Sequence, residues 1–287
     1  MSEQQVGDIW SKYGKAFLIL ARDGPGIIPA RNMVEATNNL YPYASALTVL
    51  DLGCGVGELT NAVIESHGSE LPRSSRLVAS DIAPGMIEHL EVRKADGFAR
   101  GIKAWRKVET SVDDAHYLAA FADGSVSHVL AGFVLFMVPR PRVVLREIHR
   151  LLTDENGGGV FSMSSWLNLD SEWYHIMTLT NQFRPERKSM TMPREWLTIE
   201  GVQGELEEAG FRDVNVYPLK TYLPFQEYEK LADFMINTFP NMDRMTAGFT
   251  KEELAELRRQ IIGYVKSKHP TVPSKLEGTA IIAVCRK

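Results

Sequence analysis

The chain has few cysteines and no excess of positive charge. Its 287 residues include two cysteines, Cys54 and Cys285, and 32 Lys and Arg stand against 36 Asp and Glu, for a formal net charge of -4. Neither cysteine has metal-ligand spacing, so no metal site is predicted, and the low number favours a reducing compartment. Because nucleic acids and anionic membranes are bound by basic faces, the charge argues against broad partners of those kinds.

Long apolar runs are missing as well. No run approaches the roughly 20 apolar residues of a membrane span, and residues 1–8 are polar and acidic, unlike a secretory signal. Hydrophobic residues at 44% and charged residues at 24% are ordinary for a globular chain, whose length allows a well-buried core. We therefore expect a cytoplasmic protein, a monomer or homodimer, whose partner is a small-molecule substrate.

A glycine-rich turn stands out between a predicted strand and a predicted helix. The apolar run 46–50 leads into Asp51-Leu52-Gly53-Cys54-Gly55-Val56-Gly57, and an amphipathic segment, 59–65, follows. Backbone N–H groups at such a turn bind an extended, partly anionic ligand. The pattern departs from the dinucleotide fingerprint, because Glu58 replaces its third glycine and because Asp51 would repel a phosphate but accept hydrogen bonds from an amino group.

This turn resembles motif I of the class I S-adenosylmethionine-dependent methyltransferases, whose cofactor carries an ammonium, a carboxylate and a sulfonium. The resemblance implies a Rossmann-like α/β fold with a seven-stranded, mostly parallel sheet and helical lid insertions. It also implies S-adenosyl-L-methionine as the cofactor, with no metal. A glycine turn of purely structural use is the alternative for this motif taken alone.

Two acidic positions after later strands fit the same cofactor. Asp81 ends the predicted strand 76–80, where a carboxylate can accept from two vicinal ribose hydroxyls. Asp114-Ala115 follows the predicted strand 108–112 and matches a pair that binds the adenine amine in the family. Asp81 could instead cap the helix that starts near Pro84, and Asp114 could be a solvated loop acid.

The remaining pattern completes an α/β order. Strands are predicted at 127–134, 160–164, 211–218 and 278–286, the last antiparallel beside the fifth, and helices at 139–152, 201–210, 225–239 and 252–266. Four parts are expected. They are a helical cap (1–45), a cofactor-binding core (46–165), a lid insertion (166–199), and a C-terminal part of the core (200–287) with a helical insertion at 225–268.

The order of motifs is similar to that of small-molecule methyltransferases of the ubiquinone-biosynthesis type. Ser164-Ser165-Trp166 and the segment 204–214 extend the likeness to fungal secondary-metabolite methyltransferases, including the gliotoxin-type thiomethyltransferases. The expected cofactor contacts are Tyr13, Asp51, Gly53, Cys54, Gly55, Gly57, Asp81, Ile82, Met86, Asp114, Ala115 and Phe133. The expected substrate contacts are Trp10, Phe136, Trp166, Trp173 and Trp196.

We thus predict methyl transfer to a thiol or hydroxyl of a small, largely apolar substrate, driven by orientation within aromatic walls. His175, in the aromatic segment after Trp166, is the candidate general base, with a packed or surface lid residue as the alternative. Two other functions stay open. The chain could bind the cofactor while catalysing a pericyclic rearrangement, or it could be a non-catalytic ligand-binding protein.

Overall fold

The computed structural model describes residues 3–186 and 192–287. Within them, one sheet has the strand order β3-β2-β1-β4-β5-β7-β6. Its strands are β1 (Thr48–Leu52), β2 (Arg76–Asp81), β3 (Val108–Val112), β4 (His128–Gly132), β5 (Val160–Trp166), β6 (Arg212–Phe225) and β7 (Ser274–Arg286). β7 runs antiparallel to β5 and β6, and the other neighbours are parallel. The predicted seven-stranded, mostly parallel sheet is confirmed, including the antiparallel last strand.

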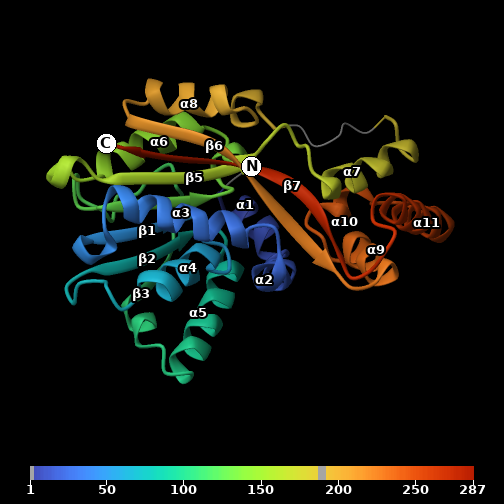
Figure 1. The fold of residues 1–287 in the computed structure, drawn as a ribbon, viewed down its shortest axis with the longest axis horizontal. Coiled ribbons are helices and arrows are strands. Elements are labelled where there is room, and N and C mark those ends of the chain that lie inside the picture. The colour runs from blue at the N-terminus through green and yellow to red at the C-terminus, as the bar shows by residue number, and fades with distance from the viewer. Residues whose placement is uncertain (1–2, 187–191) are drawn as a thin grey trace.

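Helices cover both faces of this sheet (Figure 1). One face carries α3 (Ile27–Leu40), α4 (Glu58–His67) and α5 (Pro84–Ala99), and the other carries α6 (Pro141–Leu151) and α8 (Ile199–Glu208). Two N-terminal helices, α1 (Glu3–Ser11) and α2 (Gly14–Asp23), pack against α5. The parallel order with crossover helices places the carboxyl ends of β1 to β5 at one edge.

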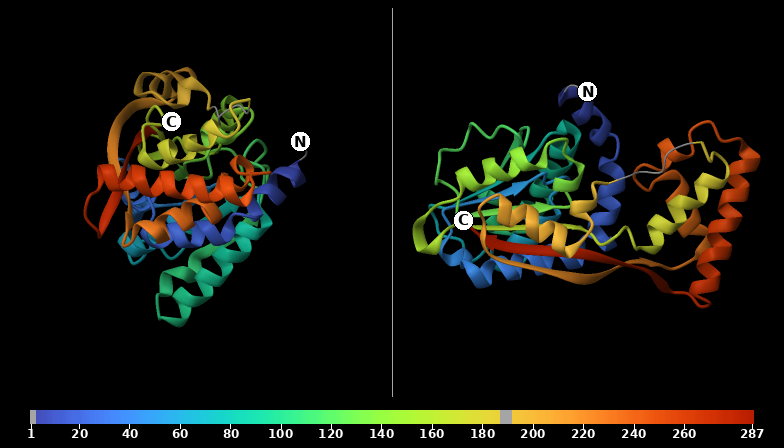
Figure 2. Two further views of the ribbon diagram at one scale, coloured as in Figure 1. Left: turned by 90° about the vertical axis from the view of Figure 1, so that its right-hand side faces the viewer. Right: turned by 90° about the horizontal axis from the view of Figure 1, so that it is seen from above.

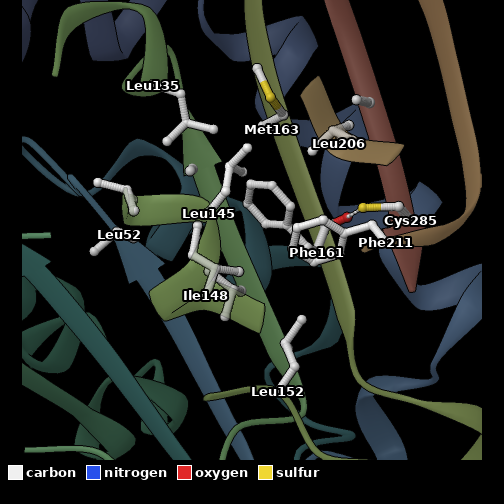
Figure 3. Packing of buried hydrophobic residues seen from close by; sticks show 14 of the residues in the cluster. Leu52, Leu135, Leu145, Ile148, Leu152, Phe161, Met163, Leu206, Phe211 and Cys285 are labelled. Carbon is white, nitrogen blue, oxygen red and sulfur yellow. Dashed lines mark hydrogen bonds between the residues drawn. The ribbon is translucent and has the colours of Figure 1, made fainter. Parts of the chain in front are cut away.

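The pattern of apolar residues explains the packing. Val144, Leu145, Ile148 and Leu151 form one buried face of α6 and pack against β4 and β5, as the periodicity of the sequence predicts. Figure 3 shows this cluster around Phe161, whose carbonyl lies against the Cys285 thiol. Every residue of β1 is buried because helices lie on both of its faces.

The N-terminal 45 residues contribute both to the core and to the cavity wall. Met33 and Val34 of α3 are fully buried among residues of β1, β2 and α4, so α3 is a core helix. All three helices also reach the cavity at the carboxyl ends of the strands, through Trp10 of α1, Phe17 of α2 and Met33 of α3. The sequence predicts amphipathic helices in this region, but the pattern of apolar residues does not show which surface of the protein each helix packs against.

Strands β6 and β7 are longer than predicted. β7 pairs with β5 from Ala280 to Arg286, whereas its residues from Ser274 to Thr279 pair with β6 alone. The two strands therefore project beyond the sheet, as Figure 2 shows, and a group of helices packs on the projection. We call this group the helical lobe; it comprises α7 (Glu172–Thr178), α9 (Tyr228–Asn237), α10 (Met242–Met245) and α11 (Lys251–Lys268).

The helical lobe has an apolar core of its own. Leu223 and Leu276 of the projecting strands are packed with Trp173 of α7, Met235 of α9 and Ile261 of α11. Residues 187–191, within the lid insertion predicted at 166–199, lie outside the described residues. The lobe joins the segments after β5 and after β6, which are far apart in the sequence.

Truncation of the α6 face is expected to destabilise the whole domain. Leu145 is fully buried in the main cluster, so Leu145→Ala should lower the free energy of unfolding by roughly 2 to 5 kcal/mol. Val92, which is 69% exposed on α5, provides the control, because Val92→Ala should change stability by less than about 0.5 kcal/mol. Urea unfolding measures both, and equal effects would contradict the described packing.

Candidate functional site

A cavity of about 1160 Å³ lies at the carboxyl ends of the parallel strands. The glycine turn, the end of β2 and the loops after β3 and β4 form one part of its wall. Residues of α1, α2, α3, the end of β5 and the helical lobe also line it. Fourteen of the residues expected at the site line it: Trp10, Asp51, Gly53, Cys54, Gly55, Asp81, Ile82, Met86, Asp114, Ala115, Phe133, Phe136, Trp166 and Trp173.

The glycines of the turn serve different purposes. Gly53, Gly55 and Gly57 all have positive φ, which favours glycine at each. A Cβ on Gly57 would lie 2.3 Å from Leu90 Cδ1, so that glycine is required by packing against α5, and Gly57 does not line the cavity. A Cβ on Gly55 would meet nothing within 4 Å, and this residue does line it. Close approach to a ligand is therefore possible at Gly55.

Asp51 is a buried carboxylate near the carboxyl end of β1. Its Oδ2 accepts hydrogen bonds from the Thr60 backbone N–H at 2.8 Å and from Thr60 Oγ1 at 2.6 Å. Its Oδ1 is buried and has no hydrogen-bond partner among the described residues. Burial, partly offset by the Thr60 hydrogen bonds, raises the pKa of Asp51 to about 6. An unpaired buried oxygen of this kind needs a hydrogen-bond donor or a cation.

Asp81 holds the turn and the start of α5 together. Its Oδ2 accepts from the Gly55 N–H at 2.8 Å, and its Oδ1 accepts from the Ala83 N–H at 2.9 Å. Burial raises the pKa of this carboxyl, while these backbone hydrogen bonds act in the opposite direction. Asp81 therefore lines the cavity and does not cap α5, whose N-cap residue is Ala83.

Asp114 and His116 form a pair in the loop after β3. Asp114 Oδ1 lies 2.6 Å from His116 Nδ1 and accepts from the His116 backbone N–H at 2.9 Å. Both residues line the cavity, although the sequence indicates only a loop role for His116. The Asp114 carboxylate is therefore held in place by its neighbour rather than solvated.

Aromatic rings form the wall opposite these acids. Phe133 stacks on Trp166 with ring centroids 4.2 Å apart, and Trp166 packs edge-on against Trp173 at 5.3 Å and Tyr174 at 6.2 Å. Phe133 has a φ of 56°, which is uncommon for a residue other than glycine. Its N–H donates to Ser164 Oγ at 3.1 Å, and this hydrogen bond helps to hold the unusual conformation.

His175 does not lie in the cavity wall, contrary to the expectation for a general base. The side chain is exposed on α7 and its ring stacks on Tyr264 of α11, 4.3 Å away. Trp173 and Met177 of the same helix face the lobe core and the cavity instead. Because α7 presents its apolar face inward, His175 is directed to the opposite side.

Trp196 and Tyr13 also do not line the cavity. Trp196 is fully buried in the main cluster between β5 and α8, where it packs as a core residue. Tyr13 lies behind the turn, and its hydroxyl donates to Asp243 Oδ1 at 2.9 Å. Burial, followed by this hydrogen bond, raises the pKa of Tyr13 to about 12. Tyr13 therefore connects the N-terminal helices to the helical lobe.

Glu58 also lines the cavity. From the sequence we note only that it replaces the third glycine of the dinucleotide fingerprint, and we predict no role for it in the site. It begins α4, lines the cavity, and its Oε1 is buried with no hydrogen-bond partner among residues 3–186 and 192–287. Burial raises the pKa of Glu58 to about 7, and the charge of Arg93 opposes this shift. Its position next to Gly57 is the sequence signal that could have found it. Tyr174, Arg140 and Arg244 are further lining residues without such a signal.

The described part of the chain has neither a candidate metal site nor a membrane-spanning helix. Residues 3–186 and 192–287 contain no group of three or more His, Cys, Asp or Glu side chains that could hold a metal ion. No helix within those ranges has both the length and the apolar character needed to span a bilayer.

Comparison with known proteins connects this geometry to an enzyme family. A family model described as a methyltransferase domain matches residues 50–161. The methyltransferase ucsB of Acremonium sp is 30% identical over 255 residues, which cover 88% of this chain and 86% of the relative. The methyltransferase tpcH of Aspergillus fumigatus is 25% identical over 276 residues, covering 90% of this chain and 91% of that protein.

Solved structures share the fold at lower sequence identity. A chain from the complex of the Haloferax volcanii Trm112 methyltransferase activator with a methyltransferase matches with a TM-score of 0.57 and 18% identity, covering 98% of this chain and 96% of its own. The [4+2]-cyclase SpnF matches with a TM-score of 0.54 and 16% identity, covering 100% and 97%. With the cavity at the strand ends and the similarity to ucsB along most of both chains, this protein belongs to the class I S-adenosylmethionine-dependent methyltransferases.

Proposed function

We propose that the chain methylates a thiol or an acidic hydroxyl of a small, largely apolar substrate, of the kind made in fungal secondary metabolism. The observation that carries the proposal is one cavity with an unpaired buried carboxylate oxygen on Asp51 and a stacked aromatic wall around Trp166. The first feature suits the cationic cofactor and the second suits an apolar acceptor. The fungal origin of the relatives ucsB and tpcH supports the metabolic setting.

The residues at the strand ends fit S-adenosyl-L-methionine. Asp51 Oδ1 is a buried acceptor without a donor, which an ammonium group would supply. Gly55 leaves space for close approach of a ligand to the backbone. Asp81 would hold the ribose hydroxyls, and Asp114 with Ala115 would hold the adenine. When bound, the sulfonium of the cofactor supplies the methyl group.

The acceptor side of the cavity points to catalysis by orientation. The carboxylates and the histidine among the described lining residues all come from residues 51–116. The end of β5 and the lobe contribute Trp166, Trp173, Met177 and other residues without a carboxylate or imidazole. Holding the reacting groups in line within such a wall can be worth roughly 7 to 11 kcal/mol of the barrier.

The same wall restricts the acceptor. The described lining residues from β5 and the lobe include no carboxylate or imidazole, so we expect an acceptor that releases its proton readily, as thiols and phenols do with ordinary pKa values of about 8.5 and 10. Arg140 and Arg244, both exposed residues at the cavity, favour an anionic acceptor electrostatically. An aliphatic alcohol gains little from these features.

A methyl-transfer assay tests the proposed function. Incubation of the purified chain with methyl-labelled cofactor and panels of thiols, phenols and amines should transfer label to a thiol or phenol. Conversion of a substrate without label transfer would support a rearrangement instead, and binding without conversion would support a ligand-binding role. Since His175 lies outside the cavity wall, His175→Ala should leave the rate with thiols and with phenols within about twofold of the wild type.

Loss of the Asp81 carboxylate should weaken cofactor binding. Asp81→Ala removes a charged acceptor that we expect to bind the ribose, which costs about 1.5 to 3 kcal/mol per hydrogen bond, or at least roughly tenfold in Kd. Calorimetry with S-adenosylhomocysteine measures the change. Asp96→Ala, at an exposed position on α5, is the control and should bind normally. Unchanged affinity in a folded Asp81→Ala protein would remove Asp81 from the site.

The buried Asp51 carboxylate should make the ligand-free protein less stable as the pH rises. Its pKa is about 6 in the folded chain and 3.8 in the reference state, so the folded state binds the proton more tightly. This contribution to stability is present below pH 4 and is lost between about pH 4 and 6, by roughly 3 kcal/mol at 1.36 kcal/mol per pKa unit.

Asp51→Asn should remove this part of the pH dependence. Urea unfolding of both proteins without ligand at pH 4, 5 and 6 gives the comparison, with the exposed variant Asp8→Asn as the control. Burial, the main cause of the Glu58 pKa shift, acts in both proteins, whereas the smaller contribution from the Asp51 charge is lost in the variant. Parallel curves for wild type and Asp51→Asn would show that the Asp51 pKa is not raised.

A further inference from the structure

Glu58 is a half-buried acid, with one fully buried carboxylate oxygen, that the proposed contacts to the cofactor do not use. It lines the cavity beside the glycine turn, and Oε1 is buried without a hydrogen-bond partner in the described ranges. A Cβ placed on Gly26, at the start of α3, would lie 2.5 Å from Glu58 Oε2, so the carboxylate is packed against that backbone. A buried carboxylate without a partner costs several kcal/mol in general, which calls for a compensating group.

Asp51 is a comparable group whose charge acts on Glu58. It lines the same cavity from the other end of the glycine turn, and it too has one buried oxygen without a partner in the described part of the chain. Of the cations near Glu58, Arg93 donates at 3.4 Å to the Val56 carbonyl rather than to the carboxylate. Asp51 Oδ1 and Glu58 Oε1 are thus two buried oxygens without partners in the described ranges, and they belong to residues that line the same cavity at the two ends of the glycine turn.

Resting on the proposed use of S-adenosyl-L-methionine, we propose that Glu58 is a second acid for the cofactor's ammonium group and acts with Asp51. Three N–H donors of an ammonium can serve carboxylates on two sides at once. The two negative charges then select for a ligand with an intact amino group. A ligand without that group leaves both carboxylates uncompensated.

Two ligands separate this role from others. S-adenosylhomocysteine carries the ammonium, and its des-amino analogue, with hydrogen in place of the amino group, does not. The wild-type chain should bind the first at least tenfold more tightly than the second in calorimetry. Glu58→Gln, which keeps the shape of the side chain but removes its charge, should reduce this preference about tenfold, mainly by weakening S-adenosylhomocysteine.

Glu65→Gln is the matched control because Glu65 lies on the same helix with its side chain 52% exposed. It should keep the wild-type preference. Partial unfolding of a variant would lower the binding stoichiometry and leave the ratio of the two affinities unchanged, so the ratio reports on the contact itself.

The outcomes are distinct. A reduced ratio in Glu58→Gln with an unchanged ratio in Glu65→Gln supports the inference. An unchanged ratio in Glu58→Gln overturns it, and a concurrent loss of methyl transfer would then assign Glu58 to the acceptor. If the wild-type chain binds neither S-adenosylmethionine nor S-adenosylhomocysteine, the proposed function itself fails.

Discussion

The hydrogen bonds from Thr60 to Asp51 Oδ2 are the interaction on which the site depends. They join the end of β1 to the first turn of α4 across the glycine turn, in a place where the carboxylate has almost no access to water. One oxygen is satisfied and the other is not, so the carboxylate is held in place by Thr60 and still leaves one acceptor for a hydrogen-bond donor or a cation. The free-energy cost of burying the Asp51 carboxylate therefore arises at the cavity wall, where binding of a cationic ligand can offset it.

The sheet topology determines which kinds of side chain line each part of the cavity. Because β1, β2 and β3 are adjacent and parallel, their carboxyl ends place Asp51, Asp81 and Asp114 along one edge. The antiparallel pair β6 and β7 projects past this edge and brings the helical lobe over it. Acidic groups thus come from the sheet, and Trp173, Tyr174 and Met177 come from the lobe.

The sequence predicts the first of these contributions well. The end of a strand can be predicted from the local sequence. Because the strands are parallel and adjacent, Asp51, Asp81 and Asp114, which belong to separate sequence motifs, all line one cavity. The lobe is different because the rotation of each helix depends on tertiary packing. His175 and Trp173 are two residues apart on α7, yet one is exposed and the other is buried.

The local sequence also does not separate core residues from cavity residues when both are tryptophans. Trp196 belongs to the core of the sheet and Trp166 to the cavity, and nothing in the sequence near either tryptophan separates them. Glu58 was missed for another reason. A charged residue at a helix start is ordinarily solvated, and the contact with Gly26 and the buried Oε1 become visible only in the folded chain.

The cavity has an acidic part at the strand ends and an aromatic part from β5 and the lobe, and the fold alone does not determine which reaction takes place there. The cyclase SpnF has a similar fold, so a cofactor-binding sheet edge does not by itself define a reaction. The reaction depends on the wall that faces this edge, and here the wall from β5 and the lobe consists mainly of aromatic and methionine side chains. Such a wall can orient an acceptor and exclude water but cannot take its proton. Under the proposed function, orientation is sufficient for an acceptor that ionises without help.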